Sequence, residues 1–142
     1  MEKKTIELVQ SSFNKVAPIA DIAAEIFYNR LFELDPNLQQ LFPSDNKEAM
    51  KGQGNKLMTM LASAVAGLND LDKLVPILEN LGKRHVEYKV EPHHYETVGT
   101  ALLDTLDIGL KEEFSPEVKQ AWTDVYLTMA TVMKKAAYDT VS

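Results

Sequence analysis

The spacing of the apolar residues constrains this chain more than any other feature. They recur at intervals of three and four residues, the period that brings side chains to one face of an α-helix. The clearest run follows the start signal Ser115-Pro116-Glu117 and consists of Val118, Trp122, Val125, Met129, Val132 and Ala136. No stretch alternates convincingly as a strand does. The pattern predicts an all-α fold with one layer of helices packed on another.

Cap and turn residues predict where the helices begin and end. Thr5 is expected to cap a first helix that ends near Pro18. Asp35 and Pro36 suit the cap and first position of a short helix. Pro76 is expected to begin a helix running toward residue 88, because proline lacks the amide that a helix interior needs. The other expected helices cover residues 19–34, 47–68, 93–110 and 116 onward.

Length, charge and cysteine content exclude several classes of protein. The 142 residues suit one domain, which we predict over 1–142. The net charge of −6 disfavours a nucleic-acid partner, and the absence of cysteine excludes disulfides and thiolate metal sites. The longest uncharged stretch, 57–69, is too short for a membrane span, which needs about 20 apolar residues. No secretory signal is recognisable, so we expect a cytoplasmic protein.

His85 occupies a position that the helical pattern reserves for an inward-facing apolar residue. Leu74, Leu78, Leu81 and His85 are spaced 4, 3 and 4. One interpretation is a core histidine whose ring nitrogens bond to the backbone. The other is a metal ligand. A lone imidazole cannot form a structural zinc site, which needs four ligands, but it can hold a heme iron because the porphyrin supplies the equatorial bonds.

The other two histidines, His93 and His94, are adjacent at an expected helix start. Neighbouring helical residues point about 100° apart, so we expect that these two cannot share one ligand face. A solvated helix end is the preferred interpretation for this pair.

Two further residues have both a structural and a functional interpretation. Tyr28 and Gln53 are polar groups at or beside apolar helix faces, and Gln53 shares a face with Leu57. Tyr28 is either a core residue with its hydroxyl near solvent or a hydrogen-bond donor to a ligand. Gln53 is either a surface residue or a second such donor. Phe42, in a Leu-Phe-Pro corner, is by itself only a core residue.

Several segments, in order, resemble the globin family over nearly the whole chain. They are Ile26-Phe27-Tyr28-Asn29-Arg30-Leu31-Phe32, Asp35-Pro36, Leu41-Phe42, Leu81-Gly82-Lys83-Arg84-His85, His94-Tyr95-Glu96-Thr97-Val98-Gly99-Thr100-Ala101-Leu102-Leu103 and Ala121-Trp122-Thr123-Asp124-Val125-Tyr126. The chain is most similar to single-domain bacterial hemoglobins, the globin domain of flavohemoglobins and neuroglobin-like bacterial globins. The resemblance implies a three-over-three helical sandwich with a heme pocket between helices.

The resemblance also implies roles for individual residues around heme b. It makes His85 the iron ligand, and Tyr28, Gln53 and Leu57 the residues on the ligand side. The residues that it implies for contact with the cofactor are Phe42, Lys56, Leu57, Arg84, His85, Tyr95 and Tyr126, with Lys56 and Arg84 facing the heme propionates. In flavohemoglobins a glutamate pairs with the tyrosine at position 95; here the matching residue is Ala137. That substitution puts strong electron donation by His85 in doubt.

The function implied is O₂ binding with high affinity and slow release, with conversion of NO to nitrate as the candidate chemistry. Electrons would come from a separate reductase, and O₂, NO and CO are the expected ligands. The alternative is an O₂ storage, delivery or sensing module without turnover. A third hypothesis is a heme-free helical interaction protein, against which His85, Phe42, Tyr28 and Gln53 together argue. We expect a monomer or weak homodimer.

Overall fold

The computed structural model describes residues 2–138 of the chain, and every regular element in that range is helical. The six α-helices are α1 (Lys3–Val16), α2 (Ala20–Leu34), α3 (Lys47–Ala66), α4 (Leu71–Glu87), α5 (His94–Leu110) and α6 (Pro116–Tyr138). Short 3₁₀ turns join or extend them: η1 (Ala17–Ile19), η2 (Pro36–Leu41), η3 (Gly67–Asn69) and η4 (Lys111–Glu113). The predicted all-α class is confirmed. None of the helices in this range is long and apolar enough to cross a membrane.

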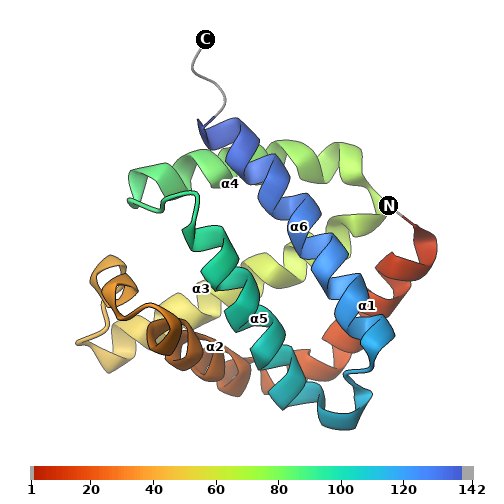
Figure 1. Ribbon diagram of the computed structural model, residues 1–142, viewed down its shortest axis with the longest axis horizontal. Coiled ribbons are helices and arrows are strands. Elements are labelled where there is room, and N and C mark those ends of the chain that lie inside the picture. Colours follow the sequence, from red (N-terminus) through yellow and green to blue (C-terminus); the bar gives the residue numbers. More distant parts are fainter. Residues whose placement is uncertain (1, 139–142) are drawn as a thin grey trace.

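The helices pack in two layers. In Figure 1, α5 and α6 run side by side in opposite directions and cross in front of α3, and α1 packs against both. The front layer in Figure 1 consists of α2, α5 and α6, and α1, α3 and α4 lie behind it. The main contacts between the layers join α4 and α1 to α6, and α2 to α3. This arrangement is the three-over-three sandwich that the resemblance implies.

Two apolar clusters fill the interior. The larger one surrounds Trp122, which is fully buried and donates its indole N–H to the Ser12 hydroxyl at 2.8 Å. The smaller one lies beneath α2 and includes Phe27, Tyr28 and Leu31. Leu102 of α5 packs against both clusters and so links them.

Two helix starts differ from the prediction. Glu2, not Thr5, is the residue that precedes α1, so Thr5 lies within the first turn. α4 begins at Leu71, and Pro76 lies inside it. The proline costs one backbone hydrogen bond near the start of the helix, but Leu74 and Leu78 are each only 4% exposed. Burial of those side chains outweighs the break that proline favours.

The cap residues predicted at two other helix starts form the expected hydrogen bonds. The Asp35 side chain accepts a hydrogen bond from the Asn37 amide at the start of η2, and Ser115 accepts one from Val118 at the start of α6. Asn46 caps α3 by accepting from the Ala49 amide.

Gly82 allows α4 to lie directly on α6. A Cβ atom added at Gly82 would collide with the Met133 carbonyl oxygen and lie 2.8 Å from its Cα, whereas one added at Gly52 meets nothing within 4 Å. We predict that Gly82→Ala lowers the free energy of unfolding by about 1–3 kcal/mol through overpacking against backbone. Gly52→Ala, the matched control, should raise it by about 0.5–1 kcal/mol. Chemical denaturation checks both, and an equal response of the two variants would contradict the packing described here.

Candidate functional site

Tyr28 is held in a fixed orientation by an aromatic group from α2 and η2. It is 6% exposed and meets the ring of Phe42 edge-on at 5.2 Å between centroids. Phe27 lies edge-on to it at 5.1 Å, and Phe32 lies at 6.1 Å. Phe42 itself ends η2 in extended backbone, which brings its ring back toward α2. The phenol therefore has a single well-defined position.

The Tyr28 hydroxyl is bonded to Gln53, 25 residues further along the chain. The Gln53 Nε2 group donates to Tyr28 Oη at 3.3 Å across the contact between α2 and α3. Because the phenol oxygen accepts this bond, its own proton is available to a third group. Burial raises the pKa of Tyr28, and the Gln53 hydrogen bond offsets part of that rise. The phenol thus stays protonated, and is a donor, at neutral pH.

Leu57 lies one helical turn beyond Gln53 and borders a small apolar cavity. The cavity has a volume of about 20 Å³, and its walls come from α1, α2, α3 and α5. Phe27, Leu61, Leu102 and Leu106 are among its lining residues. A space of this size and polarity suits a small uncharged molecule better than water, which needs polar partners.

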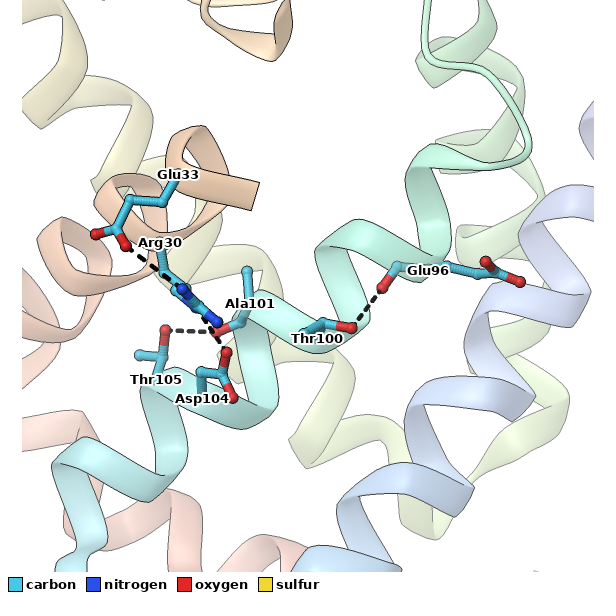
Figure 2. Close-up of polar contacts among 7 residues, drawn as sticks. All are labelled: Arg30, Glu33, Glu96, Thr100, Ala101, Asp104 and Thr105. Carbon is cyan, nitrogen blue, oxygen red and sulfur yellow. Dashed lines mark hydrogen bonds and ion pairs between the residues drawn. The ribbon is translucent and has the colours of Figure 1, made fainter. Parts of the chain in front are cut away.

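An ion pair fixes α2, and with it Tyr28, against α5. Figure 2 shows Arg30 between two carboxylates, with its Nε atom donating to Asp104 Oδ2 at 2.7 Å and its Nη1 atom 3.4 Å from Glu33. The same view shows Thr105 of α5 donating to the carbonyl oxygen of Ala101. Ala101 is fully buried in the Tyr28 cluster, so α5 approaches α2 closely there. The sequence pattern had not singled out Arg30.

His85 lies near the end of α4. Within residues 2–138, its hydrogen bond and its aromatic contact are both to residues near the end of the same helix. Its Nδ1–H donates to the Leu81 carbonyl oxygen at 2.8 Å, and its ring lies 6.2 Å from that of Tyr88. Burial lowers the pKa of His85, and the positive charge of Arg84 lowers it further, whereas the Leu81 bond acts in the opposite direction. The ring is therefore neutral at pH 7, and its Nε2 lone pair is available for a metal.

Tyr95 and Tyr126 connect α5 to α6. The Tyr126 hydroxyl donates to the Tyr95 carbonyl oxygen at 2.6 Å, and the Tyr126 ring occupies the space where a side chain at Gly99 would be. Burial raises the pKa of Tyr95 to about 12. Its hydroxyl is buried and has no hydrogen-bond partner among residues 2–138.

The two cations predicted near the site are both on the surface. Lys56 of α3 and Arg84 of α4 are exposed, and neither takes part in an ion pair within residues 2–138. Their charges are available to an external carboxylate. Such exposed pairs contribute only about 0–1 kcal/mol each.

The structure thus brings Tyr28, Phe42 and Gln53 into direct contact, with Leu57 next to them. It places His85 separately, on a different helix. Beyond η3, the helices α3 and α4 have few contacts along their lengths. Half-buried apolar side chains pack against the Tyr28 cluster, among them Phe42, Met50, Leu57 and Val98.

Comparison with known proteins identifies the family. The sequence profile described as Globin matches residues 25–133, which is most of the chain. The chain belongs to the globin family. It is 28% identical over 130 residues to a flavohemoprotein of Bacillus subtilis (strain 168), covering 92% of this chain and 32% of the relative. It is also 28% identical over 145 aligned positions to a neuroglobin of Tetraodon nigroviridis, covering 95% and 91%. A flavohemoprotein of Xylella fastidiosa (strain Temecula1 / ATCC 700964) is 30% identical over 133 residues, covering 92% and 32%.

Two facts follow from these matches. The chain spans about a third of the length of the flavohemoproteins that it matches, but most of the length of the neuroglobin. Membership of the globin family supports heme as the cofactor and O₂ as a ligand. It identifies neither the form of the heme nor the chemistry that follows gas binding.

The residues present fit a heme. A globin needs one neutral imidazole with a free nitrogen, and His85 provides one because Leu81 takes the proton of the other nitrogen. It also needs apolar side chains that can contact the porphyrin, and Phe42 and Leu57 are half-buried side chains of that kind. The Tyr95 hydroxyl is a buried polar group without a hydrogen-bond partner among residues 2–138.

Two tyrosine-to-phenylalanine variants test the hydrogen bonding described for the Tyr95 and Tyr126 hydroxyls. Tyr126→Phe removes a made hydrogen bond and should lower the free energy of unfolding by about 1 kcal/mol or more. Tyr95→Phe removes a buried hydroxyl without a partner and should leave the stability unchanged or raise it by about 1 kcal/mol. Denaturation of both variants provides the comparison. A larger loss for Tyr95→Phe than for Tyr126→Phe would show that the Tyr95 hydroxyl is bonded after all.

Proposed function

We propose that this globin binds heme b through His85 and retains O₂ tightly, with NO oxidation as its chemistry. The observation that carries the proposal is the hydrogen bond from Gln53 to Tyr28, because it turns a buried phenol into a directed donor. When bound, heme would supply an iron that His85 could hold and that could bind a diatomic gas. The protein residues determine which gas stays and for how long.

On the His85 side, the chain fixes the imidazole before the cofactor arrives. The Leu81 carbonyl selects the tautomer and the orientation of the ring, so little rotational freedom is lost on binding. Phe42 and Leu57 provide apolar surface for the porphyrin, and Lys56 and Arg84 provide surface charges for its propionates. Tyr95 and Tyr126 hold α5 and α6 together beside it. With no glutamate at position 137, His85 donates less electron density than a carboxylate-linked histidine would.

On the side where the gas would bind, Tyr28 and Gln53 place two hydrogen-bond donors next to each other. The Tyr28 hydroxyl keeps its own proton for the gas, and Gln53 has a second amide hydrogen beyond the one it gives to Tyr28. Such donors would favour a bound gas that carries partial negative charge, as O₂ would, over CO. An amide is also a poorer iron ligand than imidazole, so Gln53 would act as a hydrogen-bond donor to the gas and not compete with it for the iron. Each donor contributes about 0.5–1.5 kcal/mol, and 1.4 kcal/mol corresponds to a tenfold change in affinity.

The rate of O₂ dissociation measures these donors directly. Tyr28→Phe keeps the aromatic packing but removes the donor, so we expect dissociation to become about tenfold faster. Gln53→Leu should accelerate it by a smaller factor, because Tyr28 remains but loses its partner. Gln120→Leu, at an exposed glutamine of α6, is the matched control and should leave the rate unchanged. Stopped-flow displacement of O₂ by CO gives all four rates. A wild-type rate in Tyr28→Phe would contradict the proposed ligand-side geometry.

The proposed NO chemistry requires an electron donor. The balanced reaction is NO + O₂ + e⁻ → NO₃⁻, so each turnover needs one electron from a donor outside this chain. The flavohemoproteins among the relatives are named for a flavin as well as a heme, which supports a flavin-dependent electron donor for this chemistry. We expect nitrate well in excess of heme when NADH and a separate flavin-dependent reductase are supplied. One equivalent of nitrate followed by arrest would favour storage, delivery or sensing instead.

A further inference from the structure

A second group of ligating side chains lies at the corner where α2 ends and α5 begins. Asp35, His93 and His94 each offer one ligand atom, and these atoms all lie within 4.8 Å of one another. His94 is buried at 8% exposure, Asp35 is half-buried and His93 is exposed. The cluster therefore has a protein wall on one side and solvent access on the other.

The two histidines do share a ligand face, contrary to the expectation from their adjacency in sequence. Their ring centroids are 4.3 Å apart. The reason is that the 100° rule fixes only where the Cβ atoms point, and each imidazole then turns about its own side-chain torsions. His94 is the first residue of α5 and His93 precedes it, so the His93 side chain is not confined by a preceding helical turn.

Glu91 brings a fourth group to the same place. Its Oε2 atom lies 3.9 Å from Nε2 of His93 and 3.9 Å from Nε2 of His94. Two imidazole rings and two carboxyl groups thus lie close together at this corner. The carboxylates give the cluster the negative charge that a dication neutralises.

We propose that Asp35, Glu91, His93 and His94 form a binding site for a divalent transition-metal ion, with zinc as the best fit. Imidazole nitrogen with carboxylate oxygen is a donor set that zinc accepts, whereas calcium and magnesium prefer all-oxygen sites. Bonds of about 2.0–2.2 Å in a tetrahedral site place the ligand atoms about 3.3 Å apart. The ligand atoms of Asp35, His93 and His94 lie within 4.8 Å of one another, so they must move closer to bind one ion. The side chains of His93 and Glu91 are exposed, so packing leaves them room to move.

Metal binding would break one specific hydrogen bond, and the loss of that bond can be measured. The Nδ1 atom of His94 accepts a hydrogen bond from the Glu91 amide at 2.9 Å. When Nε2 binds a metal, the remaining ring proton is on Nδ1 and faces that amide, so the bond must break. The Glu91 amide is therefore the backbone group that responds most to the ion.

The site is separate from the one proposed for heme. It uses both histidines other than His85, and it connects the end of α2 to the turn that follows α4. An ion here would restrain the segment 88–93, through which α4 leads into α5. The proposal does not depend on heme binding, and the His85→Ala variant separates the two by losing heme while keeping this cluster.

Titration of the tag-free heme-loaded protein with zinc chloride in a non-chelating buffer tests the proposal. Isothermal calorimetry should show one zinc per chain, and His93→Ala should weaken its binding at least about tenfold. Asp35→Asn should weaken it as well, while its remaining side-chain oxygen still accepts the Asn37 amide bond that starts η2. Asp21→Asn, at the opposite end of α2, is the matched control and should not change the affinity.

The amide spectrum provides the second readout. In ¹H–¹⁵N correlation spectra, zinc should shift the Glu91 amide in the wild type and in His85→Ala, and should shift it much less in His93→Ala. Equal zinc affinity in the wild type, His93→Ala and Asp35→Asn would overturn the proposal. So would zinc binding that leaves the Glu91 amide unmoved.

Discussion

The hydrogen bond from His85 Nδ1–H to the Leu81 carbonyl is the interaction on which the proposed site depends. It leaves Nε2 as the nitrogen that is free to bind a metal, and it holds the ring in one plane. The bond exists only because α4 is continuous from Leu71 through Glu87, so that residues four apart lie one above the other. α4 in turn is held by its close contact with α6 at Gly82 and by burial of Leu74 and Leu78. Packing of α4 against α6 thus helps to fix the orientation of the His85 ring.

The gas side depends on a different set of helices. Tyr28 is positioned by α2, Gln53 by α3, and Phe42 by the extended residue that ends η2. Arg30 and Asp104 fasten α2 to α5, and Leu102 joins the cluster around Tyr28 to the larger core. The two halves of the proposed heme site are therefore built by separate packing units. A flat cofactor between them would be recognised by two preformed faces and would not need to order a loose chain.

The sequence predicted those features that depend on periodicity or on a strong local signal. The six long helices, the caps at Asp35 and Ser115 and the inward position of His85 all come from one-dimensional patterns. The resemblance to globins added Tyr28 and Gln53, and the structure brings them into contact; their roles toward a ligand stay predictions. Pattern reasoning failed at Pro76, where buried leucines extend the helix across a residue that normally ends one.

Contacts between distant segments were beyond the reach of the sequence. The approach of Asp35 to His93 and His94 is determined by how α2 and α5 pack, and neither segment alone predicts it. That the Tyr95 hydroxyl has no hydrogen-bond partner among residues 2–138 is likewise a property of the packed structure. Side-chain torsions matter as well, since the rule that separates adjacent helical residues says nothing about where their rings finally lie.

The most direct test of the central claim is heme retention by His85→Gly. The account predicts that this variant keeps its helical circular dichroism but releases hemin to an acceptor such as apomyoglobin much faster than the wild type. Added imidazole, which restores the missing nitrogen ligand, should slow that release again. Unchanged colour, stoichiometry and release rate in the variant, without imidazole, would show that His85 does not hold the iron and would contradict the account.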